Sequence, residues 1–89
     1  MTANYREIPA HVRNLESFTG NSMNAFRNET SRGIEYVVAS YGTAIGRVTP
    51  DGTARINARK YSTTTSRHQN ILRAAWPNAT DVPTERDLY

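Results

Sequence analysis

Residues 33–49, GIEYVVASYGTAIGRVT, carry the strongest strand signal in the chain and decide its fold class. Valine, isoleucine and tyrosine dominate this segment, and such side chains favour a pleated sheet surface. Apolar side chains occur at both alternating sets of positions, which predicts that both faces of the strand are at least partly covered. Gly42 interrupts the run and marks either a tight hairpin at Tyr41 and Gly42 or a bulge in one long, bent strand. We favour the bulge, because Thr43 resumes the strand pattern at once.

The next segment of the chain predicts a turn and a partner strand. In Thr49-Pro50-Asp51-Gly52, proline presets φ at the second position and glycine accepts a positive φ at the fourth. Residues 53–61, TARINARKY, then predict an antiparallel strand. One of its faces, turned to the core, carries Ala54, Ile56 and Ala58. The other face forms a basic row that ends in an aromatic residue: Arg55, Asn57, Arg59 and Tyr61.

Residues 66–76, SRHQNILRAAW, predict one helix. Ser66 and Gln69 have the spacing of a capping box, in which each side chain satisfies the other's free backbone N–H. An apolar stripe with helical spacing follows and consists of His68, Ile71, Leu72 and Ala75. Pro77 ends the helix, because proline cannot continue the backbone hydrogen bonding.

These elements together predict an α+β fold with a small antiparallel sheet of two to three strands, one C-terminal helix packed on it and flexible termini. SMNAFRN (22–28) is the third candidate strand, and ETSRG (29–33) is expected to be a loop. We divide the chain into an N-terminal arm (1–21), an α+β domain (22–76) and an acidic C-terminal tail (77–89). A chain of 89 residues buries only ~60% of its unfolded surface, so association with a second copy or another protein would stabilise it.

Composition excludes several classes of protein. The chain has no cysteine, which rules out disulfides and thiolate metal sites, and its two histidines lack the spacing of a zinc motif. No apolar run approaches the ~18 residues of a membrane-spanning helix, and the first residues lack the apolar core of a signal peptide. We therefore expect a cytoplasmic protein that uses no metal or cofactor.

Positive charge is concentrated in the middle of the chain. The formal net charge is +3, and every basic residue except Lys60 is arginine. Asp51 is the only acidic residue between positions 47 and 73, a stretch that holds six basic ones: Arg47, Arg55, Arg59, Lys60, Arg67 and Arg73. Such a basic centre predicts an anionic partner, either nucleic acid or an acidic protein surface. The alternative is a solvated face that is partly neutralised by the acidic tail.

Residues 60–69, KYSTTTSRHQ, admit three interpretations. Tyr61 and His68 beside basic residues are the types found in a metal-independent ribonuclease, where histidine transfers a proton. However, the segment has no carboxylate to orient His68, and this histidine lies on the apolar stripe, so we predict that the protein is not an enzyme. The helix-start hydroxyls Thr64, Thr65 and Ser66 either donate to an anion at the helix N-terminus or satisfy their own backbone.

Two of these segments resemble an uncharacterised family of small proteins from bacteriophages and actinobacterial mobile elements. The resemblance covers about residues 36–73. It rests on a SYGT-x-I strand and on a YS-x-TTS-x-H segment that opens a helix. The matching residues are Ser40, Tyr41, Gly42, Thr43, Ile45, Tyr61, Ser62, Thr64, Thr65, Ser66 and His68. The resemblance implies a phage or mobile-element accessory protein, and it implies no particular activity.

We therefore expect a non-enzymatic phage accessory protein that binds a host or phage protein complex in the cytoplasm of the infected cell and modulates it. Arginine and tyrosine are typical anchors of protein interfaces, and the candidate interface aromatics are Tyr36, Tyr41 and Tyr61. The alternative is a nucleic-acid-binding protein that contacts DNA or RNA through the six central basic residues. Pairing with a second copy of the chain is compatible with both interpretations.

Overall fold

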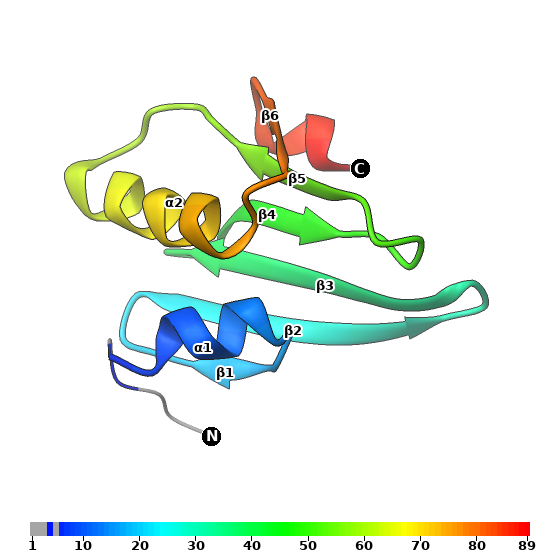
Figure 1. Ribbon diagram of the computed structural model, residues 1–89. Helices are drawn as coiled ribbons and strands as arrows, with labels where there is room; N and C mark the ends of the chain where they lie inside the picture. Colours follow the sequence, from blue (N-terminus) through cyan, green and yellow to red (C-terminus); the bar gives the residue numbers. More distant parts are fainter. Residues whose placement is uncertain (1–3, 5) are drawn as a thin grey trace.

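The computed structural model describes residue 4 and residues 6–89, which form one sheet with helices on both of its faces (Figure 1). The strand order in space follows the sequence: β1 (Phe18–Thr19), β2 (Met23–Thr30), β3 (Gly33–Ser40), β4 (Thr43–Val48), β5 (Ala54–Asn57) and β6 (Thr80–Val82). The first five strands are antiparallel, and β6 lies parallel to β5. A parallel pair needs a long crossover connection, and here the crossover contains the main helix.

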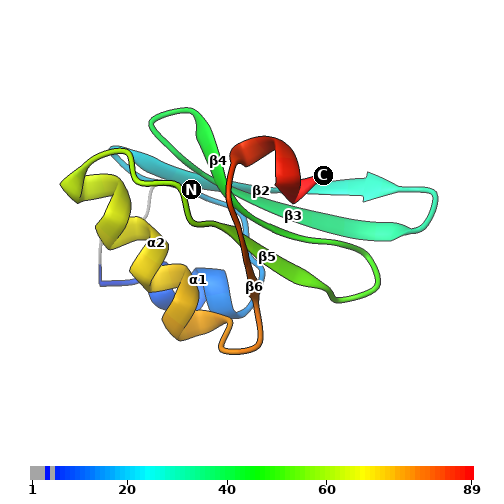
Figure 2. The same ribbon diagram turned by 90° about the horizontal axis from the view of Figure 1, so that it is seen from above.

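Two α-helices, α1 (Ile8–Arg13) and α2 (Thr63–Ala75), pack against each other across one face of the sheet. The short 3-10 helix η1 (Glu85–Leu88) lies on the opposite face, against β4 and β5 (Figure 2). None of the helices in the described part of the chain is long and apolar enough to cross a membrane.

The main core lies between the two α-helices and the sheet. Its buried side chains are Ile8, Val12, Phe18, Met23, Ala25, Tyr36, Val38, Ile45, Val48, Ile56, Leu72 and Trp76. Gly46 lets α2 approach β4 closely, because a Cβ at this position would lie 2.5 Å from Leu72 Cδ1. A smaller cluster on the opposite face contains Val37, Ala44 and Leu88. Both faces of β3 and β4 are therefore covered, as the apolar residues at alternating positions predicted.

The prediction of two to three strands is wrong, because the sheet has six strands and is mixed. One cause is the turn at Tyr41 and Gly42, which have φ values of 51° and 81°. Two residues with positive φ form the tight hairpin turn that matches the twist of the flanking strands. The predicted bulge at Gly42 is therefore wrong, and the register shift between β3 and β4 occurs between Val38 and Ala39.

The loop predicted for residues 29–33 is also wrong, because β2 continues to Thr30 and only Ser31 and Arg32 form the turn. The end of β2 is polar and exposed, so the alternation that reveals a half-buried strand is absent there. Pairing with β3 determines its conformation instead, and Thr30 Oγ1 donates a hydrogen bond of 2.7 Å to the Gly33 carbonyl.

The prediction of flexible termini is also wrong. Near the N-terminus, α1 buries Ile8 and Val12 in the main core. Residues 80–82 form β6, and Leu88 of η1 is fully buried against the sheet. Glu85 Oε2 accepts a hydrogen bond of 2.6 Å from the Ala44 N–H, which attaches η1 to β4. The boundaries at residues 21 and 76 stay a prediction, although strands from all three predicted parts join the same sheet.

The helix exists, but its start is earlier than predicted. Ser62 is the N-cap, and its Oγ accepts a hydrogen bond of 3.1 Å from the Thr65 N–H. Gln69 does not reach back to Ser66, because its Nε2 donates to the carbonyls of Asn57 and Arg59 at 2.6 and 2.9 Å. Gln69 therefore joins α2 to the end of β5.

Candidate functional site

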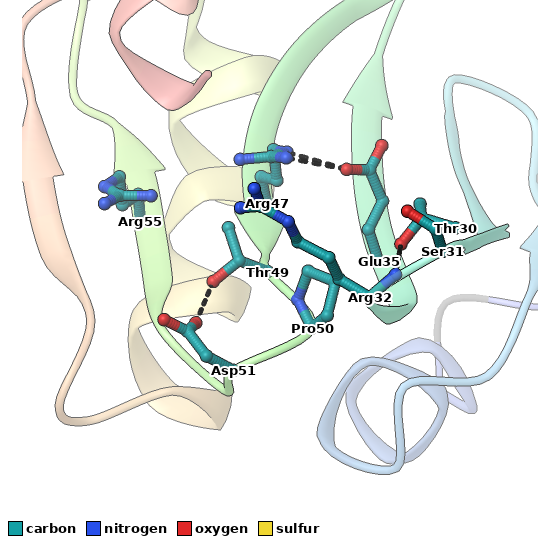
Figure 3. A pocket seen from close by; sticks show the side chains of 9 residues that line it. All are labelled: Thr30, Ser31, Arg32, Glu35, Arg47, Thr49, Pro50, Asp51 and Arg55. Atoms are coloured by element: carbon teal, nitrogen blue, oxygen red, sulfur yellow. Dashed lines mark hydrogen bonds and ion pairs between the residues drawn. The ribbon is translucent and has the colours of Figure 1, made fainter.

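A cleft of about 540 Å³ opens where the β2–β3 turn lies beside the β4–β5 turn (Figure 3). Its walls are rich in arginine and in hydroxyl groups, and the lining residues are Thr30, Ser31, Arg32, Glu35, Arg47, Thr49, Pro50, Asp51 and Arg55. Gly33 allows the two turns to approach each other. It has a φ of +127°, and a Cβ there would lie 3.2 Å from Pro50 Cβ.

Arg47 forms the fixed wall of the cleft. Its Nη2 and Nε donate to Glu35 Oε2 at 2.7 and 3.1 Å, and its Nη1 donates to the Leu88 carbonyl at 3.1 Å. The guanidinium also lies 5.0 Å from the centre of the Tyr89 ring. The hydrogen bond from Arg47 lowers the pKa of Glu35. Arg47 is therefore largely neutralised by Glu35, and its hydrogen bonds connect β4 to β3 and η1.

Asp51 is engaged within the β4–β5 turn. Its Oδ1 accepts hydrogen bonds from Thr49 Oγ1 and, at 3.0 Å, from the Thr53 N–H. These bonds, the one from the Thr49 side chain first, lower the pKa of Asp51 to about 2. The aspartate thus stays charged and shapes the turn, while the Coulombic effect of Arg55 on its pKa is small.

Arg32 and Arg55 supply the positive charge in the cleft that is available to a ligand. Figure 3 shows Arg32 reaching from the β2–β3 turn past Pro50, while Arg55 approaches from β5. Neither side chain forms an ion pair within residues 4 and 6–89. Guanidinium groups donate paired hydrogen bonds to carboxylates and phosphates. The two side chains are therefore available to bind an anionic group in the cleft.

The six predicted basic residues are not gathered on one surface. Arg47 and Arg55 are cross-strand neighbours on the face of the sheet that carries η1. Two others, Arg59 and Lys60, lie exposed in the connection from β5 to α2. The last two lie on α2, Arg67 and Arg73, and the Arg73 guanidinium is 3.7 Å from Asp81.

The three predicted interface aromatics differ in exposure. Tyr36 is buried in the main core, where its OH donates a hydrogen bond of 2.8 Å to the Glu16 carbonyl. Burial raises the pKa of Tyr36, and the side chain is not available on the surface. Tyr41 is 64% exposed at its turn and Tyr61 is 40% exposed, with Arg59 stacked 5.7 Å from the centre of the Tyr61 ring.

Two residues of the KYSTTTSRHQ segment, Thr65 and His68, form a buried polar junction with Ser40. Ser40, at the end of β3, contacts His68 Nδ1 at 2.7 Å and Thr65 Oγ1 at 3.0 Å. All three side chains are buried. Burial, with a smaller contribution from Arg67, lowers the pKa of His68. This favours the neutral imidazole, and the contacts attach the N-terminal half of α2 to β3.

The helix-start hydroxyls do not act as one group. Of Thr64, Thr65 and Ser66, only Thr65 is buried and bonds to the junction. The cap itself comes from Ser62, and Tyr61 OH accepts a hydrogen bond of 2.9 Å from Asn57 Nδ2. The hydroxyl-rich sequence is thus explained largely by the passage from strand to helix.

Sequence reasoning missed Arg32 and Glu35 of the cleft. Arg32 belongs to a segment that was expected to be a loop. Glu35 meets Arg47 only because β3 and β4 pair with Val37 opposite Arg47, which places the two charges diagonally across the ladder. The turn signal in Ser31-Arg32-Gly33 was visible and could have indicated a tight hairpin. The meeting of the two turns had no local signal.

The residues of the cleft and the junction do not suggest a metal centre. Within residues 4 and 6–89, no three histidine, aspartate or glutamate side chains lie close enough together to hold a metal ion. No curated protein and no solved structure matches the chain. A family model matches residues 6–87, almost the whole of the described chain, and its description is a family of unknown function (DUF8033). The chain therefore belongs to this uncharacterised family.

Proposed function

We propose that the protein is a small binding module that holds a carboxylate-bearing segment of a partner protein in the cleft between its two turns. The observation that carries this proposal is the placement of Arg32 and Arg55. Both line the cleft, and neither has an ion-pair partner among the described residues. The neighbouring Arg47 is held rigidly by Glu35 and the Leu88 carbonyl, so the wall is formed before any partner arrives.

The mixed charge of the cleft favours a protein partner over nucleic acid. Glu35 and Asp51 lie in its walls, and their lowered pKa values keep both carboxylates charged. A nucleic-acid backbone would bring a row of phosphates past them, and its affinity depends on many neutralised phosphates. The remaining basic residues lie on other elements and do not extend the cleft into a continuous track. A single carboxylate group needs only the two available guanidinium groups.

The proposal includes no catalytic step. The enzyme hypothesis requires His68 to transfer a proton, but in the structure His68 contacts Ser40 in the interior. The relative exposures of the two residues are 0% and 1%, so a substrate could not reach them without local unfolding. Their position between β3 and α2 supports a structural role. The rest of the proposal follows the resemblance: an accessory protein of a phage or mobile element that engages a host or phage protein complex in the infected cell.

The test measures binding of a labelled peptide rich in glutamate and aspartate. The cleft variant is Arg32→Gln/Arg55→Gln, and the matched control Lys60→Gln/Arg67→Gln removes the same charge elsewhere. A charge-assisted hydrogen bond contributes about 1.5–3 kcal/mol, so losing two guanidinium partners should weaken binding at least about 10-fold. The control should bind like the natural protein. Equal weakening by both variants would show that net charge, and not the cleft, holds the peptide.

Identification of the natural partner uses the same variants as bait. Proteins from a host lysate that the natural protein and the control retain, but the cleft variant loses, are the expected partners. A duplex DNA probe in a salt series forms the second arm of the experiment. Binding of DNA in preference to the acidic peptide, with steep loss of affinity at higher salt, would replace the protein hypothesis with the nucleic-acid one.

A further inference from the structure

The outer edge of β2 is only partly covered. β1 pairs with Asn24 and Ala25, and no strand in the described part of the chain lies along β2 from Phe26 to Thr30. The hairpin of β2 and β3 extends well beyond β1 (Figure 1). An open edge of this kind presents unpaired N–H and C=O groups to another strand.

The direction of the backbone groups on β2 follows from its neighbours. The Gly20 N–H donates to the Met23 carbonyl at 2.8 Å, on the side of β1, while the Tyr41 N–H donates to the Ser22 carbonyl on the side of β3. Backbone groups of successive residues alternate between the two sides of a strand. The outward groups of the open part are therefore those of Arg27 and Glu29.

This edge is complementary to itself in one register. Suppose that an identical strand lies antiparallel to β2, with the two Asn28 residues opposite each other. Arg27 of each copy then faces Glu29 of the other. Both outward-directed residues then form hydrogen-bonded pairs, and two opposite-charge pairs lie on the same face of the sheet. Opposite charges across strands stabilise pairing, and like charges destabilise it. A register centred on Arg27 would instead place the two Arg27 residues opposite each other. A register centred on Glu29 would place the two Glu29 residues opposite each other.

We propose that a second copy of this chain pairs with the open edge of β2, so that the two six-stranded sheets become continuous. Phe26, which is 41% exposed, then lies opposite the partner's Thr30 on the other face and loses solvent exposure. The proposal goes beyond the cleft and does not depend on it. Most edges that avoid such pairing carry lysine, proline or a bulge, and residues 26–30 contain neither proline nor lysine and pair with β3 without a register shift.

The symmetry of this pair has a consequence for binding. Antiparallel pairing of identical edges places the twofold axis along the normal of the sheet. The same face of both sheets then points in the same direction, and the two arginine-lined clefts open on one side of the dimer. A partner with two acidic segments could engage both clefts at once, with a gain in affinity from linkage.

The test uses charge exchange at residues 27 and 29 and measures molar mass by light scattering or sedimentation over a wide concentration range. Arg27→Glu gives an edge with two glutamates, and Glu29→Arg gives an edge with two arginines. Each variant alone should dimerise at least about 10-fold more weakly than the natural chain, since attraction becomes repulsion in two pairs. An equimolar mixture should form a heterodimer, because every pair is again of opposite charge.

The doubly exchanged chain, Arg27→Glu/Glu29→Arg, serves as the matched control and should dimerise like the natural protein. Circular dichroism of each variant shows that the monomer is folded. A natural chain that stays monomeric at every concentration would overturn the proposal. Two further results would also overturn it: dimerisation of both single variants as strong as that of the natural chain, or failure of the two single variants to associate when mixed.

Discussion

Replacement of Gly46 by alanine tests the contact between α2 and β4 most directly. The new Cβ would lie 2.5 Å from Leu72 Cδ1 and 2.7 Å from Trp76 Cζ3. The Trp76 ring has little room to move, because its Nε1 donates a hydrogen bond of 3.2 Å to the Val12 carbonyl and it packs edge-to-face with the Tyr36 ring. Relief of the overlap therefore requires a shift of α2 relative to the sheet.

Overpacking of a buried site lowers the free energy of unfolding by about 1–3 kcal/mol. A glycine-to-alanine change without a steric conflict would instead raise it by about 0.4–1 kcal/mol, through the entropy of the unfolded chain. The two outcomes differ in sign. For a domain of this size, each kcal/mol corresponds to about 4–8 °C in Tm. We expect Gly46→Ala to lower Tm by about 4–24 °C.

Urea denaturation and thermal melting provide the assay, followed by circular dichroism and by the fluorescence of Trp76, the only tryptophan in the chain. Gly52→Ala is the control, because Gly52 has a φ of +89° and no neighbouring atom within 4 Å of its Cβ position. That change strains the backbone without placing the new methyl group in contact with Trp76. In a Leu72→Val background, which lacks the Cδ1 atom, Gly46→Ala should cost less. A variant Gly46→Ala as stable as the natural protein would refute the described packing.

Three further predictions address the elements that the sequence did not place correctly. Ser62→Ala should lower the free energy of unfolding by about 0.5–2 kcal/mol in urea titrations, while Ser66→Ala should change it by less than about 0.5 kcal/mol. A larger effect at Ser66 than at Ser62 would mean that Ser66 caps the helix, as the capping-box prediction had it. Leu88→Ala should cost about 2–5 kcal/mol, whereas a disordered tail would make it neutral. The hydrogen bond from Arg47 lowers the folded-state pKa of Glu35, so its contribution to stability is present above the unfolded-state pKa and is lost as pH falls through the folded value. Glu35→Gln should therefore reduce the loss of Tm between neutral and acidic pH, and an unchanged pH profile would contradict this reasoning.

Local patterns predicted much of the central part of the fold. The strand signal over residues 33–49, the turn at residues 49–52 and the helix with its apolar stripe all correspond to elements of the structure. Ile56 and Leu72 were placed in the core and are buried there. These signals are reliable because side-chain alternation, proline and glycine act within a few residues of the chain.

Errors arose where the pattern was ambiguous between neighbours in sequence. The hairpin at Gly42 requires a positive φ at Tyr41 as well as at Gly42, and a tyrosine rarely adopts such a value. Similarly, Ser62 and Ser66 both suit a helix cap. The position of Gln69 decided between them, because its side chain bonds to the end of β5 rather than to the helix start.

The sequence by itself determined that this chain has strands around Gly42, a helix before Pro77 and a basic centre, because these follow from local conformational preference and composition. Only the tertiary structure decided that the tail supplies β6 and Leu88, and that Glu35 binds Arg47 across the ladder. It also decided that Arg32 lines one cleft with two of the central basic residues, Arg47 and Arg55, while the other four do not. Such contacts depend on strand register and on the approach of two turns, which no short segment encodes.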